Sequence, residues 1–185
     1  MIRTLAVLVA LSSVASVATV YSQSVYLRVE ISAPNNGNAP VADLKPFNPP
    51  GMSLADRTAI QHMWEGMEFQ LTPVARWCEM PVEVSIDVSS FQGQLVRGTQ
   101  DGLHPGTRSR FYDVARAMSA VCNGGDMQRD AVRSTIRGMR FGFTQSPNDT
   151  LTIQDGTLVF TTNGDLTGRS HLGYADMINR IMEML

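Results

Sequence analysis

The sequence predicts an α+β protein: a single domain in which a small antiparallel sheet is packed on one face by amphipathic helices. Some segments have apolar and polar residues in strict alternation, as strands do. Between them lie segments whose apolar residues recur at helical spacing. A chain of 185 residues is long enough for one sizeable hydrophobic core. Its two cysteines are the even number expected of a disulfide in an exported protein.

The N-terminal residues 1–18 have the three parts of a secretory signal peptide. A positive charge at Arg3 precedes an apolar run over 5–11, and small residues follow up to Ala18. Cleavage after Ala18 would leave a domain of residues 19–185. The alternative is an uncleaved N-terminal anchor, because the next charge after Arg3 is Arg28. Either way the protein is expected to be periplasmic or secreted, with membrane contact only if the segment is uncleaved.

The first half of the domain is predicted to hold two strands and one helix. Residues 25–31 and 82–88 alternate apolar and polar side chains, as half-buried strands do. Residues 33–51, rich in Pro, Asn and Gly, read as an extended connector. Ser53 is a plausible N-cap for the helix that follows, which Pro73 should end at the latest.

The second half is predicted to hold three more helices and a hairpin. A helix runs through Phe111 to Cys122, and a second begins at Asp126 and gives way to a strand near 138–142. Asp155-Gly156 suits a type I′ turn between two β-rich arms. The last helix has one apolar stripe, expected to face the core: Leu172, Ala175, Ile178, Ile181, Met182 and Leu185.

Cys78 and Cys122 are predicted to form a structural disulfide. Two cysteines are too few for a zinc or iron-sulfur site, and their spacing differs from the Cys-x-x-Cys of redox enzymes. An oxidising compartment outside the cytoplasm favours the bridge over free thiols.

The sharpest candidate binding motif is a run of arginines in the third predicted helix. Arg129, Arg133, Arg137 and Arg140 recur at i, i+4, i+8 and i+11, which predicts a stripe beside the apolar face. Four guanidinium groups in a row suit an acidic protein or an anionic envelope component. The alternative is a solvated helix face in which Asp126 and Asp130 pair with arginines three residues on.

Composition and the motifs that the sequence lacks reduce the number of possible functions and partners. A formal net charge of −2 gives no bias toward nucleic acid, so no nucleic-acid partner is expected. Phosphate-loop, dinucleotide and metalloprotease motifs are missing from the sequence, so we expect no cofactor.

A small envelope hydrolase using His104 or His171 as a base is the alternative function. A copper site at His62 and Met63 is a third, weaker hypothesis, because methionines at this spacing usually fill cores.

These observations favour an exported cell-envelope binding or interaction protein of unknown ligand over an enzyme. The arginine pattern places four charges in one spatial arrangement, whereas the histidines are isolated and lack an identified nucleophile.

Overall fold

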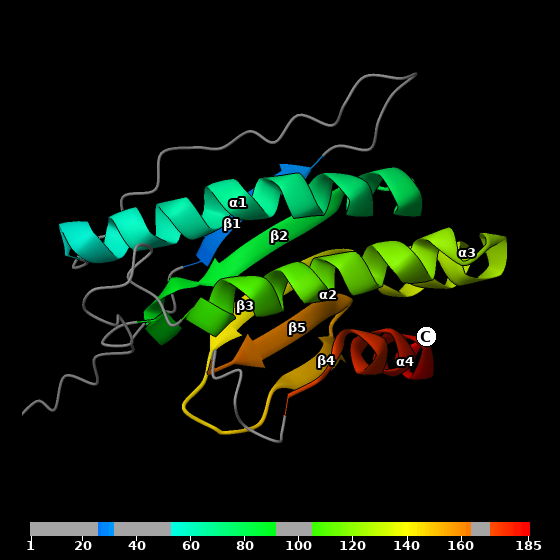
Figure 1. Cartoon of the computed structure of the whole chain (residues 1–185). Helices are drawn as coiled ribbons and strands as arrows, with labels where there is room; N and C mark the ends of the chain where they lie inside the picture. The colour runs from blue at the N-terminus through cyan, green and yellow to red at the C-terminus, as the bar shows by residue number, and fades with distance from the viewer. Residues whose placement is uncertain (1–25, 32–52, 92–104, 164–170) are drawn as a thin grey trace, which may run out of the picture.

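The computed structural model describes residues 26–31, 53–91, 105–163 and 171–185 and confirms the α+β class (Figure 1). The predicted signal peptide, the connector at 33–51 and His104 lie outside these residues. The elements follow in the order β1 (Tyr26–Ile31), α1 (Leu54–Cys78), β2 (Val82–Asp87), the 3-10 helix η1 (Val88–Phe91), α2 (Pro105–Asn123), α3 (Asp126–Thr135), β3 (Gly138–Phe143), β4 (Thr150–Gln154), β5 (Thr157–Thr162) and α4 (Tyr174–Met184).

The five strands form one sheet in the order β1-β2-β3-β5-β4, and this sheet is mixed rather than purely antiparallel. The outer pairs β1·β2 and β4·β5 are antiparallel, whereas β2·β3 and β3·β5 are parallel. Helices α2 and α3 carry the chain back along the sheet between β2 and β3, so both strands start at the same end. The predicted hairpin is confirmed at Asp155 and Gly156, whose φ angles of 49° and 78° suit a type I′ turn.

Helices α1, α2 and α4 lie side by side over one face of the sheet, as predicted (Figure 1). Alternate residues of β2, β3 and β5 point into the layer between, and these are fully or almost fully buried: Val82, Val84, Ile86, Met139, Phe141, Leu158 and Phe160. Phe111 of α2 anchors the helices to the sheet, with its ring centroid 4.9 Å from that of Phe141 and 6.0 Å from that of Phe160. Helices α1–α4 and strands β2–β5 thus contribute to one hydrophobic core.

Helix α1 does not end at Pro73, contrary to the sequence prediction. It continues for five residues to Cys78. A proline inside a helix removes one backbone hydrogen bond and usually kinks or ends it. Here four residues of the turns around Pro73 are fully buried in the core, namely Leu71, Val74, Ala75 and Cys78. Burial of this apolar face outweighs the lost hydrogen bond, because most helical stability in proteins comes from such packing.

The predicted disulfide is confirmed. Cys78 ends α1 and Cys122 lies in the last turn of α2, and their Cα atoms are 5.0 Å apart. Both residues are fully buried. The bridge therefore joins the C-terminal ends of the two longest helices inside the core.

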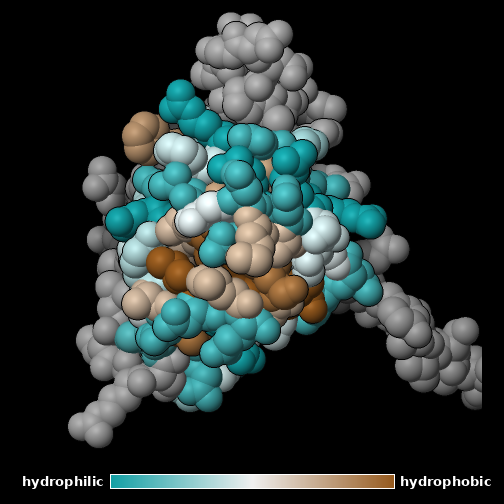
Figure 2. Space-filling model, turned by 90° about the vertical axis from the view of Figure 1, so that its right-hand side faces the viewer, coloured by the Kyte–Doolittle hydropathy of each residue, from teal (hydrophilic) through white to brown (hydrophobic). Residues whose placement is uncertain are grey.

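The end of the molecule at which α1, α2 and α4 stop exposes apolar side chains. Figure 2 shows a band of hydrophobic residues on this face, bordered by hydrophilic ones. Exposed hydrophobic residues in the terminal turns here are Trp77, Met127 and Met182. The predicted inward stripe of α4 is confirmed in part. Ile181 is fully buried, and Leu172, Ile178 and Leu185 pack against the core, whereas Ala175 and Met182 are exposed and Met177 is buried in their place. In the ranges described, no helix is both long and apolar enough to cross a bilayer.

Candidate binding site

The four arginines do not form one stripe, because α3 ends at Thr135. Ile136 adopts an extended conformation with φ −114° and ψ 124° and is fully buried. Arg137 follows the helix, and Arg140 lies on strand β3. The structure therefore divides the set into a pair on α3 and a pair at the sheet. A binding role for these arginines stays a prediction.

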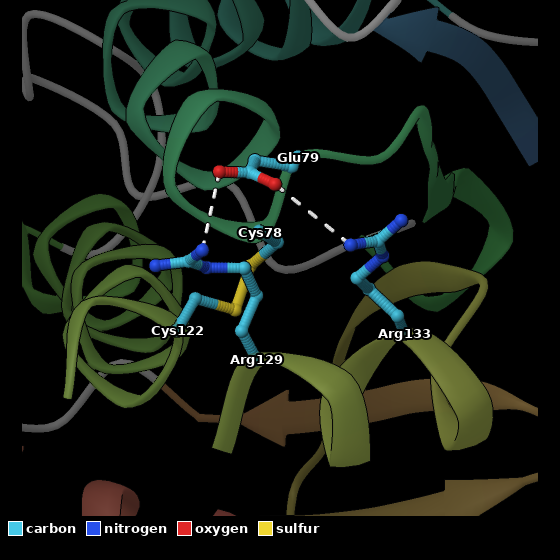
Figure 3. Close-up of a disulfide and its surroundings, with 5 residues drawn as sticks. All are labelled: Cys78, Glu79, Cys122, Arg129 and Arg133. Carbon is cyan, nitrogen blue, oxygen red and sulfur yellow. Dashed lines mark hydrogen bonds and ion pairs between the residues drawn. A yellow bond between two sulfur atoms is a disulfide. The ribbon is translucent and has the colours of Figure 1, made fainter. Parts of the chain in front are cut away.

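Arg129 and Arg133 both approach Glu79, the residue after the disulfide (Figure 3). Their Nη1 atoms lie 3.2 and 3.8 Å from the two carboxylate oxygens of Glu79. Each also pairs within α3, Arg129 with Asp126 at 3.3 Å and Arg133 with Asp130 at 3.9 Å. Three carboxylates thus surround two guanidinium groups, so this cluster offers little net positive charge to a partner. Its evident role is to join α3 to the end of α1.

A groove of about 220 Å³ runs along α2, between α1 on one side and the start of α4 on the other. Its lining comes from all three helices: Gln70, Pro73 and Trp77 from α1, Arg116, Ser119, Ala120 and Asn123 from α2, and Tyr174 from α4. The α2 residues recur at i, i+3, i+4 and i+7, so they lie along one face of this helix. The groove exists because α2 is flanked by α1 and α4 in the helical layer (Figure 1).

Aromatic side chains and a cation occupy the sides of the groove. Trp77 is 43% exposed and Tyr174 is 38% exposed. The Arg116 guanidinium lies 5.1 Å from the centroid of the Tyr174 ring, within cation–π range, and its Nη1 is 3.6 Å from the Asp113 carboxylate. Stacking on the ring and pairing with Asp113 hold this cation in place while leaving its side chain 59% exposed.

The α2 side of the groove contains a buried hydroxyl without a partner. Ser119 is 8% exposed, and its Oγ atom makes no hydrogen bond to any residue that the structure describes. A buried polar atom of this kind costs free energy unless a ligand, a water molecule or a partner supplies the missing bond. The groove thus contains an unused hydrogen-bonding group beside its aromatic walls.

A buried ion pair fixes the start of α4 and therefore the position of Tyr174. Arg110 of α2 is 5% exposed, and its Nη2 donates to the Asp149 carboxylate and to the carbonyl oxygen of Leu172. The same carboxylate accepts from the backbone N–H of Leu172 at 3.2 Å. Asp149 precedes β4, so the pair connects α2, the sheet edge and the residues just before α4.

The hydrolase and copper hypotheses stay predictions, because His104 lies outside the described residues. His62 is exposed on α1, and His171 is half-buried, with an Nε2 atom that makes no hydrogen bond to a described residue. Among the described residues, no three His, Cys, Asp or Glu side chains are placed to hold a metal ion. The side chain of Met63 lies outside the description.

Sequence reasoning missed the groove. Trp77 and Tyr174 are far apart in the chain, and each belongs to a helix whose boundaries or inward face differ from the prediction.

Comparison with known proteins adds no assignment: no family model, no curated protein and no solved structure matches this chain.

Proposed function

We propose that the protein is an exported interaction protein of the cell envelope and that it binds an acidic segment of a protein partner in the groove along α2. The observation that carries this proposal is the gathering of Trp77, Tyr174 and Arg116 around one concave surface. Tryptophan, tyrosine and arginine are the residue types that dominate binding energy at protein interfaces. Each of these three side chains is more than a third exposed.

The charge of the groove supports an acidic partner. Among the described residues, its lining includes one cation, Arg116, and no carboxylate. Asp113 contacts the guanidinium from outside the groove, which leaves other N–H groups of Arg116 for a partner carboxylate. The amides of Gln70 and Asn123 and the hydroxyl of Ser119 add hydrogen-bonding groups for a peptide backbone.

Two observations support export. Residues 1–18 have the order of charge, apolar run and small residues that a signal peptide needs. The disulfide between Cys78 and Cys122 is of the kind that persists in oxidising compartments such as the periplasm. Both are compatible with a periplasmic or secreted protein.

Selection from a random peptide library, followed by affinity measurement, tests the groove directly. We expect the selected peptides to combine Asp or Glu with apolar residues. Trp77→Ala should weaken binding of such a peptide about 30-fold, which corresponds to a hot-spot loss of about 2 kcal/mol. Arg116→Gln should weaken it about tenfold and reduce its dependence on salt, because a charge contact is removed. Fluorescence anisotropy measures both effects.

Two matched variants control this experiment. Phe69→Ala removes a more exposed aromatic ring, 78% exposed, from the same helix outside the groove. Arg180→Gln removes an exposed arginine that, like Arg116, pairs with an acidic residue three positions away on its helix. Neither should change the affinity. Selection of neutral or basic peptides, or equal affinity for the Trp77 and Arg116 variants and the wild type, would contradict the proposal.

A further inference from the structure

The face of the sheet opposite the helical layer contains a hollow of about 240 Å³. It lies where the three parallel strands begin, and Glu83, Gly138 and Thr157 occupy neighbouring positions across β2, β3 and β5. The remaining lining residues are Ser85, Arg137, Met139, Arg140 and Asp155. Arg137 and Arg140, half of the arginines singled out in the sequence, are therefore brought to one site.

Gly138 creates the space at the centre of this hollow. A Cβ atom at this position would lie 2.7 Å from the backbone oxygen of Glu83 and 3.3 Å from its Cβ atom. No side chain fits there, so the row between Glu83 and Thr157 has a gap. Around the gap lie the half-buried Thr157 and the buried Ser85, whose hydroxyl is 3.5 Å from the carbonyl oxygen of Met139.

Four charged residues line the hollow: Arg137 and Asp155 are exposed at its rim, whereas Glu83 and Arg140 are half-buried. Within the described ranges Arg137 and Asp155 form no ion pair with each other or with another side chain. The backbone N–H of Arg137 donates to the carbonyl oxygen of Gly156 at 2.7 Å, which fixes the turn that bears Asp155 against the start of β3. Two unpaired opposite charges are thus held on one rigid frame.

We propose that this hollow binds a small zwitterion with the ammonium and carboxylate groups of a free α-amino acid. Arg137 binds the carboxylate, because a guanidinium offers two parallel N–H donors to such a group. Asp155 accepts from the ammonium group, and the hydroxyl of Thr157 lies within the same hollow. A ligand with both charges satisfies both exposed rim residues, Arg137 and Asp155, at once, whereas an anion or a cation alone would engage only one of these two. This site is independent of the groove along α2.

Isothermal titration calorimetry of the full chain with glycine, L-alanine and L-serine tests this proposal. Sodium acetate and methylammonium chloride serve as half-ligands. We expect the amino acids to bind with a Kd in the millimolar range or tighter, and each half-ligand to bind at least about tenfold more weakly. Arg137→Gln and Asp155→Asn should each weaken glycine binding at least about tenfold. Asparagine tolerates the left-handed turn conformation of Asp155, so the second variant keeps the hairpin.

Arg180→Gln, which removes an exposed arginine elsewhere, should bind glycine as the wild type does. The proposal is overturned if no amino acid binds, if acetate or phosphate binds as tightly as glycine, or if both rim variants retain wild-type affinity. Circular dichroism spectra of the variants establish that they are folded. A failure of this experiment leaves the peptide selection on the groove unaffected, because the two sites share no residue.

Discussion

Asp149→Ala is expected to lower the free energy of unfolding by about 3 to 5 kcal/mol, the usual cost of removing one partner of a buried ion pair. The substitution leaves the guanidinium of Arg110 buried without its principal counterion and removes the acceptor for the backbone N–H of Leu172. Urea unfolding followed by circular dichroism measures the loss.

Glu183→Ala is the control for this effect, because it breaks an ion pair whose two side chains are 52% and 65% exposed. Exposed pairs contribute at most about 1 kcal/mol. The Asp149 variant should also bind groove peptides more weakly, since the ion pair fixes the residues just before Tyr174. A stability loss for Asp149→Ala no larger than that for Glu183→Ala would contradict the structural role assigned to this pair.

Removal of the disulfide is the second change with a large expected effect. The bridge joins residues 44 positions apart, and the chain-entropy model gives a loss of about 4 kcal/mol when a loop of this size is opened. The double variant Cys78→Ala with Cys122→Ala should therefore unfold at a clearly lower urea concentration than the oxidised wild type.

Reductant provides the internal control. It should shift the wild type toward the double variant only after unfolding exposes the bridge, because both cysteines are fully buried in the folded protein. The unfolding midpoint of the double variant should be the same with and without reductant. Equal midpoints for the oxidised wild type and the double variant would show that the bridge contributes no stability.

Features with a local cause were predicted from the sequence. Apolar and polar residues alternate over 82–87 because one face of the strand is buried, and the structure has strand β2 there. Asp155-Gly156 favours a type I′ turn through its own backbone preferences, whatever surrounds it. The disulfide followed from residue count and the expected compartment, and the structure confirms it.

Features that depend on tertiary packing were not predicted. Parallel pairing of β2 with β3 depends on the path that the chain takes through α2 and α3. No local sequence pattern indicates this path. Helix α1 passes Pro73 because residues of the turns around Pro73 are buried. Apolar residues lie on more than one side of α4. Its packing against α2 and β4 determines that Met177 and Ile181 are the fully buried ones.

The candidate site was only partly accessible from sequence. The arginine spacing drew attention to residues 129–140, yet the end of α3 at Thr135 divides them, because Ile136 leaves the helix to enter the core. The groove was missed because its walls, Trp77 and Tyr174, come from two helices, α1 and α4, that both pack against α2. A sequence pattern does not show which exposed aromatic residues will become neighbours.

Site-specific photocrosslinking in cells tests the proposed function most directly. A photoreactive benzoylphenylalanine replaces Gln70, a half-buried residue of the groove, and in a control strain it replaces Gln145, an exposed residue outside it. We predict that the Gln70 position crosslinks to an acidic segment of an envelope protein, that Trp77→Ala abolishes this product, and that the Gln145 position does not give it. Absence of a crosslink at Gln70, or the same product from both positions, would contradict the proposal that the groove binds an envelope partner.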